Sequence, residues 1–212
     1  MNAHTLGHLH SLQLAQVTDN ADPDSRGRVK VRLQAAPMEM WASVVAPSAG
    51  HGYGASFVPR LEEIVVVAFV DQDTPLVLGS IWCGSGSRPQ DADPQEQHYV
   101  VRTPGDTVLE FDDNDPKVEL RTRSGYRVTV TESGGGEVTI ERGSQSVTMT
   151  AAEINVDSAG PVNISASQVN LSAALVQVDA GMSRFSGVVQ CDTLIATSVV
   201  GTAYTPGAGN MW

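Results

Sequence analysis

The chain has 212 residues, a formal net charge of −11, 41% hydrophobic residues and 5% aromatic residues. This length allows one large domain or two small ones, and an apolar content dominated by Val, with few aromatics, favours β structure. The acidic balance, without a basic cluster interleaved with aromatics, argues against nucleic-acid binding, and no apolar run reaches the ~20 residues that a membrane-spanning helix needs.

The first ten residues lack a basic region followed by an apolar stretch, so we expect no signal peptide here. His8 and His10 are spaced so that both could reach one metal ion, with His4 as the nearest third ligand. The alternative is an exposed arm that contacts a neighbouring protein, and the poor ligand count favours the arm.

Residues 11–84 predict a small β-barrel. Arg28–Leu33 alternates between polar and apolar residues. In 63–70, Glu63 is followed by a continuous apolar run typical of a strand buried on both faces. Five or six such segments are separated by turn clusters such as 19–27 and 71–75, as in a barrel. The expected barrel core consists of Val29, Val31, Trp41, Phe57, Val65, Val67, Phe69, Leu78 and Trp82.

Residues 85–98 are rich in Gln, Ser, Pro and Asp, and their composition predicts a linker. The cysteines, Cys83 and Cys191, lie in different halves, and we expect two reduced, partly buried thiols. Asp71 and Asp73 could be imagined as an acid–base pair, but the Asp-Gln-Asp-Thr-Pro sequence favours a turn that joins two strands.

The second half carries a repeat of four-residue segments in which apolar and polar residues alternate. The first segment begins at Val128 and the last begins at Val176. Successive repeat segments start 10, 9, 7, 8, 7 and 7 residues apart. A unit this small cannot bury its apolar face alone, so it needs stacked neighbours or other chains. A narrow, intertwined β-prism satisfies that need, and its expected trimer core consists of Val128, Val130, Val138, Ile140, Val147, Met149, Ile154, Val156, Val162, Ile164, Val169, Leu171, Val176 and Val178.

The last segment, 185–212, breaks the repeat and is more hydrophobic. A stack of repeats needs an atypical end to cap its last layer, and the aromatic residue at position 212 indicates an end that packs against something.

The segments 41–47, 50–54, 57–61 and 73–82, together with Gly27–Val31, resemble a known family. They are similar to the central spike proteins of contractile injection machines: phage baseplate assembly protein V, R-type pyocin spikes and the valine-glycine-repeat spikes of type VI secretion. The resemblance covers the barrel block, and the downstream Val-rich repeat has the architecture of the same family.

The resemblance implies an all-β homotrimer with an N-terminal OB-fold barrel followed by an intertwined triple-stranded β-helix, or β-prism. It implies a membrane-piercing spike at the tip of the tube in a phage tail baseplate or an injection particle, assembled in the cytoplasm of the producing bacterium. The expected partners are a baseplate hub protein at the barrel end, a PAAR-type tip protein at the other end and, transiently, the target cell envelope. The expected divisions are an arm at 1–10, the barrel at 11–84, a linker at 85–98, the β-helix at 99–184 and a cap at 185–212, with tip-protein contacts from Tyr204, Met211 and Trp212.

We expect no catalytic activity, cofactor or metal. Some members of the family insert a lysozyme domain between barrel and helix, where this chain has only the short linker. Some phage spikes end in a His-x-His iron site, but no histidine follows His98. Two alternatives remain: a trimeric fibre or adhesin that binds a surface glycan, and an enzyme on a single-chain β-helix. Oligomeric state separates the second alternative from the trimers.

Overall fold

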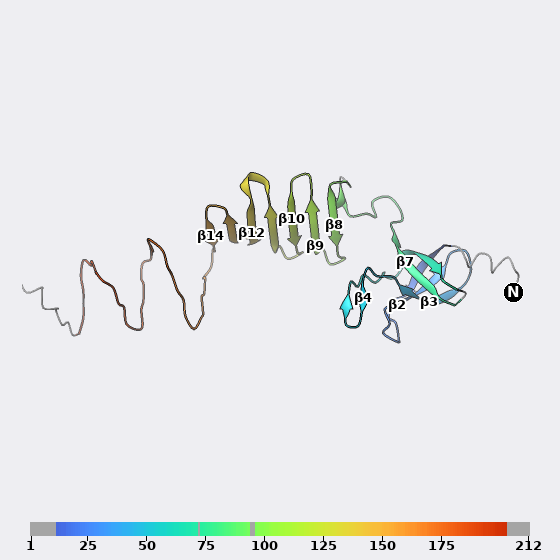
Figure 1. The fold of residues 1–212 in the computed structure, drawn as a ribbon, viewed down its shortest axis with the longest axis horizontal. Helices are drawn as coiled ribbons and strands as arrows, with labels where there is room; N and C mark the ends of the chain where they lie inside the picture. The colour runs from blue at the N-terminus through green and yellow to red at the C-terminus, as the bar shows by residue number, and fades with distance from the viewer. Residues whose placement is uncertain (1–11, 72, 94–95, 203–212) are drawn as a thin grey trace, which may run out of the picture. The chain divides into compact units, whose positions relative to one another are not determined.

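The structure is a computed structural model that describes residues 12–71, 73–93 and 96–202 (Figure 1). The chain divides into one unit that ends at Val162 and a second that begins at Asn163, and we describe each by itself. None of the described residues forms a helix with the length and apolar character needed to cross a membrane.

Five strands close into a barrel in the order β1-β2-β3-β7-β6. Its neighbouring strands pair antiparallel except β3 and β7, which run parallel. This closed five-stranded barrel confirms the predicted OB fold. The strands are β1 (Gln13–Asp19), β2 (Arg28–Leu33), β3 (Glu39–Val44), β6 (Ile64–Phe69) and β7 (Pro75–Ile81).

The barrel core follows the period of two that strands impose. On β2, Val29, Val31 and Leu33 are buried, whereas the intervening residues face outward. The core is built from small and β-branched side chains, and each fully buried Val contributes about 1.5–3 kcal/mol. Its members are Ala15, Val17, Val29, Val31, Leu33, Ala42, Val65, Val67 and Val77.

Three residues predicted for the barrel core are exposed, and the prediction was wrong for them. Phe57 is 71% exposed because it follows the strands in an irregular segment, and Trp82 is 69% exposed because β7 has already ended. Leu78 is exposed because it directly follows Val77, whose side chain takes the inward position.

The two remaining aromatics of the predicted core are half-buried. Phe69 packs against the edge of the core. Trp41 is also half-buried, and the guanidinium carbon of Arg28 lies 5.7 Å from the centre of its ring. Aliphatic side chains therefore fill the barrel, and these aromatics lie at its margin.

A small hairpin stands between β3 and β6. Its strands are β4 (Ala49–Gly50) and β5 (Tyr53–Gly54), which pair antiparallel. Cys83 and Cys191 are free, as expected, but both are exposed rather than partly buried.

Seven consecutive strands then form one antiparallel sheet, each paired with the next along the chain. An acidic turn at 113–116 joins β9 to β10, and a glycine-rich turn around Gly134 joins β11 to β12. Two short 3-10 segments, η1 (Gln90–Ala92) and η2 (Ser133–Gly135), lie in the linker and in that second turn. The strands are β8 (His98–Arg102), β9 (Val108–Asp112), β10 (Lys117–Arg121), β11 (Arg127–Thr131), β12 (Glu137–Arg142), β13 (Gln145–Thr150) and β14 (Ile154–Asp157).

Within the described residues, no strand is assigned after Asp157. The chain from there to residue 202 runs in extended stretches that reverse direction repeatedly (Figure 1). The repeat segments that begin at Val162, Val169 and Val176 fall in this region, and their apolar side chains are exposed. A strand is defined by a hydrogen-bonded neighbour, and in this region the described part of the chain supplies none.

Candidate assembly surface

One face of the seven-stranded sheet is made of apolar side chains. Residues directly opposite each other in an antiparallel ladder point to the same face. The register places the apolar positions of every strand opposite one another, so two apolar rows cross the whole sheet. The first row is Tyr99, Phe111, Val118, Val130, Val138, Met149 and Ile154, and the second is Val101, Leu109, Leu120, Val128, Ile140, Val147 and Val156.

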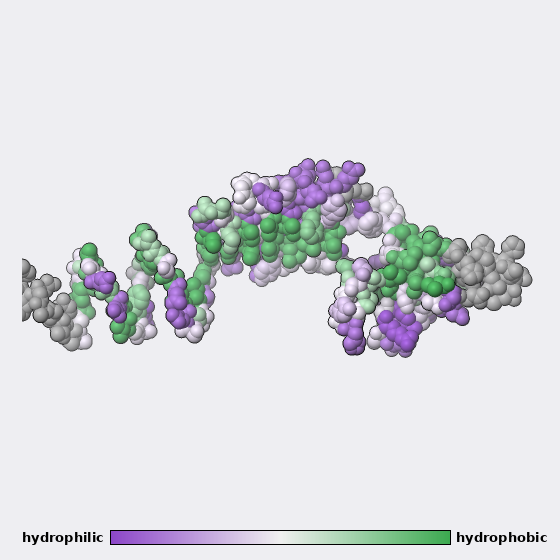
Figure 2. Space-filling model, in the orientation of Figure 1, coloured by the Kyte–Doolittle hydropathy of each residue, from purple (hydrophilic) through white to green (hydrophobic). Residues whose placement is uncertain are grey.

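This apolar face has no cover within the described part of the chain. Ile140 in the middle of the sheet is 52% exposed, whereas Val31 of the barrel core is fully buried. Figure 2 shows the result as a continuous hydrophobic band along the sheet. A contiguous apolar surface of this kind marks a protein interaction site.

The opposite face of the sheet is polar. Thr129 lies opposite Thr139, and Thr139 lies opposite Thr148, which makes a row of threonines across three strands. Threonine pairs of this kind suit a solvated sheet face. The sheet is thus amphipathic across its whole width, as expected when one face is buried against a partner and the other meets water.

Charged residues concentrate at the β9–β10 end of the polar face. Arg121 Nη1 lies 3.1 Å from Glu119 Oε1 and 3.4 Å from Glu110 Oε2. Both glutamates are buried, so a paired cation is needed to offset the loss of their hydration.

The linker is attached to this polar face through Asp91 of η1. Its carboxylate lies 2.5 Å from Arg102 Nη1 on β8 and 3.0 Å from Arg121 Nη2 on β10. The carbonyl oxygen of Asp91 also lies 3.2 Å from His98 Nδ1. The segment predicted as a linker therefore contacts the first strands of the sheet through Asp91.

His98, Glu110 and Asp112 are spaced so that they could hold a metal ion, since one ligand atom from each lies within 4.8 Å of the others. Lys117 Nζ is 3.7 Å from Glu110 Oε1, so this cation competes for the same carboxylate. Burial opposes ionisation of Asp112, but backbone N–H groups of Asp115 and Asn114 and the charge of His98 outweigh it and lower its pKa. The arrangement can work as an ion-pair network without a metal.

Sequence analysis did not anticipate this ion-pair network. His98 and Asp112 lie directly opposite each other in the β8–β9 hairpin, fourteen positions apart in the sequence. The pairing of those strands, rather than sequence proximity, brings the side chains together.

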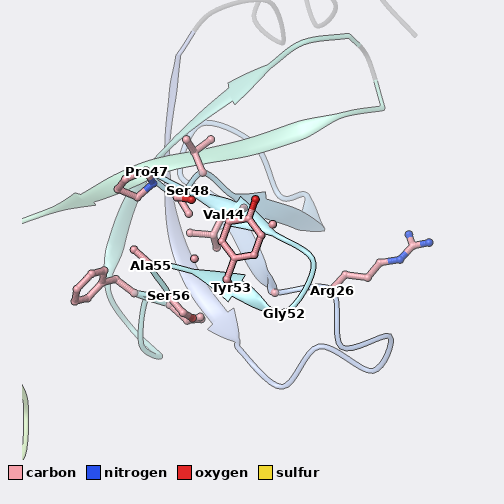
Figure 3. Close-up of a pocket in the computed structure, with 16 residues that line it drawn as sticks. Arg26, Val44, Pro47, Ser48, Gly52, Tyr53, Ala55 and Ser56 are labelled. Atoms are coloured by element: carbon pink, nitrogen blue, oxygen red, sulfur yellow. The ribbon is translucent and has the colours of Figure 1, made fainter.

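The β4–β5 hairpin borders an open pocket of about 420 Å³ beside the barrel (Figure 3). The ring of Tyr53 lies over Gly50, so close that a side chain on Gly50 would overlap it. Tyr53 and Phe57 are both exposed at this pocket. The segment 53–57 thus presents two aromatic side chains at this pocket.

The residues predicted for a trimer core fall into two groups. The eight from Val128 to Val156 lie in the two apolar rows, and the six from Val162 to Val178 lie in the region without assigned strands. That they line a trimer axis stays a prediction. Tyr204, Met211 and Trp212, with the arm histidines His4, His8 and His10, lie outside the described residues.

Six further residues belong to the apolar rows and were not predicted. The alternation in their strands could have found them, but irregular spacing before residue 128 hid the repeat. They are Tyr99, Val101, Leu109, Phe111, Val118 and Leu120.

Comparison with known proteins finds a family match for the barrel. Residues 13–82 match the family described as the type VI secretion system/phage-baseplate injector OB domain. The match spans β1 to β7, about a third of the chain. No curated protein matches the chain.

Proposed function

Because residues 13–82 belong to the injector OB-domain family of type VI secretion systems and phage baseplates, we propose that this protein is the central spike of a contractile injection machine. Three copies form a rigid spike at the tip of the tube, and contraction of the sheath drives it through the target envelope. The observation that supports this proposal most directly is the uncovered apolar face of the sheet, which follows an injector OB barrel in the chain.

The apolar face supports assembly of several copies. Fourteen apolar side chains in two rows are too many to leave in water, since each buried aliphatic contributes about 1.5–3 kcal/mol. Three sheets can meet with these faces on a common axis and their polar faces outward. Each chain then supplies one wall of a β-prism over residues 98–157, with the strand ladder formed within the chain.

The part of the chain after Asp157 supports intertwining of the three copies. For described residues after Asp157, no backbone–backbone hydrogen bond joins the chain to itself. Backbone N–H and C=O groups need partners when they are buried, and other copies can supply them. The repeat segments at Val162, Val169 and Val176 recur every seven residues. This spacing lets each copy add one strand in turn to a shared layer.

The two ends of the spike carry different partners in this proposal. The barrel end binds a baseplate hub protein, and the C-terminal segment 185–212 binds a PAAR-type tip protein through Tyr204, Met211 and Trp212. The target envelope is contacted transiently. The role requires stiffness and slow unfolding rather than turnover, so it requires no catalytic residues.

Light scattering on the purified chain tests the proposal. We expect about 67 kDa, three times the 22.4 kDa of one chain, and a trimer band that survives SDS at room temperature. A folded monomer of 22.4 kDa would overturn the triple-stranded arrangement.

A further inference from the structure

The barrel has a second apolar surface that faces outward. It covers the outer side of β1, β6 and β7, where Leu14 lies opposite Val66 and Ala68 lies opposite Leu76. At its margins Leu12 is 65% exposed and Val70 is 69% exposed. Figure 2 shows a hydrophobic area on the barrel.

The other side of the same barrel is charged. On β2 and β3, Lys30 and Arg32 pair with Glu39 at 3.3 and 3.6 Å. These pairs suit a surface that meets water, whereas the β1, β6 and β7 strands contain no lysine or arginine. The barrel therefore has one solvated side and one side with the character of an interface.

The charges around the apolar side indicate which kind of partner covers it. The segments 12–19 and 59–82, which form this side and its ends, carry five acidic residues and one cation, Arg60. The acids stand at both ends of the strands, with Glu62 and Glu63 before β6 and Asp71 and Asp73 after it. A second copy that docked with the same face would bring the same acids into contact, and like charges at an interface are repulsive.

We propose that the outer face of β1, β6 and β7 docks a different protein, one that presents an apolar surface bordered by lysine or arginine. This inference rests on the proposed function, in which the barrel end meets a hub protein, and it assigns that contact to one side of the barrel. The apolar centre supplies affinity, and the acidic border selects the partner and its orientation.

Hydroxyl-radical footprinting of the free protein and of the assembled particle tests this assignment. We expect Leu14 and Leu78 to react several-fold more slowly in the particle than in the free protein, with Trp41 on the β2–β3 side unchanged. Equal reactivity in both states would overturn the proposal. Protection already present in the free protein would also overturn it, because a second copy would then cover the face.

Charge reversal on the border provides the second test. Asp73→Lys combined with Glu62→Lys should lower incorporation of the protein into particles about tenfold, with Glu132→Lys in the turn after β11 as the control. Normal incorporation of the double variant would contradict the acidic border. Light scattering keeps the two proposals apart. A wild-type protein that is not a trimer would count against the spike, whereas loss of the trimer in the double variant alone would count against the docking face, because the acids would then border a contact between copies.

Discussion

Ile140 on β12 lies directly opposite Val147 on β13, and both side chains belong to the uncovered apolar face of the sheet. Thr139, one residue earlier, points to the polar face and lies opposite Thr148. In a prism of three sheets, Ile140 would therefore face the axis and Thr139 would face water.

Ile140→Asp should prevent trimer formation. Three carboxylates would meet near the axis, and each buried, unpaired charge costs several kcal/mol. Thr139→Asp is the matched control and should assemble normally, because its carboxylate stays hydrated. Light scattering of both variants checks this, and a normal trimer from Ile140→Asp would place the apolar face outside the subunit interface.

Val169→Asp should abolish the soluble trimer through the intertwined region. Val169 is exposed in the single chain and belongs to the seven-residue repeat, so its proposed cover comes from other copies. Asn170→Asp changes the neighbouring outward position and should leave assembly intact. Gel filtration and SDS resistance measure the difference. If the two variants assembled equally well, the inward assignment of Val169 would be wrong.

The barrel was predictable because its signals are local. Alternation on Arg28–Leu33 fixes which side chains face inward, and the buried residues Val29 and Val31 follow directly. Phe57 and Trp82 were misplaced because large aromatics usually fill cores, whereas this barrel closes around small β-branched residues. Only the pairing of strands shows that little space remains for a ring.

The ion-pair network on the sheet was beyond the reach of sequence patterns. Asp91 and Arg121 are thirty positions apart in the numbering and meet because β8, β9 and β10 lie side by side. Charged residues in a linker look solvated in the sequence, and composition gives no sign of the contact. The apolar rows, by contrast, follow from alternation once the strands are in register.

Acid should destabilise the barrel through Asp22. The Arg28 side chain, which donates to Asp22 at 2.8 Å, lowers the pKa of this carboxyl well below its usual range. A carboxyl with a lowered pKa in the folded state stabilises the fold above its unfolded pKa of about 3.9, and this stability is lost as the pH falls further. Asp22→Asn should therefore lower the melting temperature at pH 7 and flatten its decline below about pH 4.

Thermal melts of both proteins between pH 2 and pH 7 measure the Asp22 effect. The matched control is Asp24→Asn, since Asp24 also pairs with Arg28 but is more exposed. Equal acid sensitivity in the wild type and Asp22→Asn would assign the pH dependence to other carboxyls.

Gly54→Ala should destabilise the barrel more than Gly50→Ala. Gly54 has a φ of +146°, and an added Cβ would lie 2.3 Å from the backbone oxygen of Ser48. At Gly50 the obstacle is the Tyr53 ring, which is exposed and can swing away. Strained backbone positions cost about 1–3 kcal/mol, so calorimetry should show a clear loss for Gly54→Ala and a smaller one for Gly50→Ala. Gly79→Ala, with open space around its Cβ, is the control, and equal losses at all three positions would show that the hairpin geometry does not depend on Gly54.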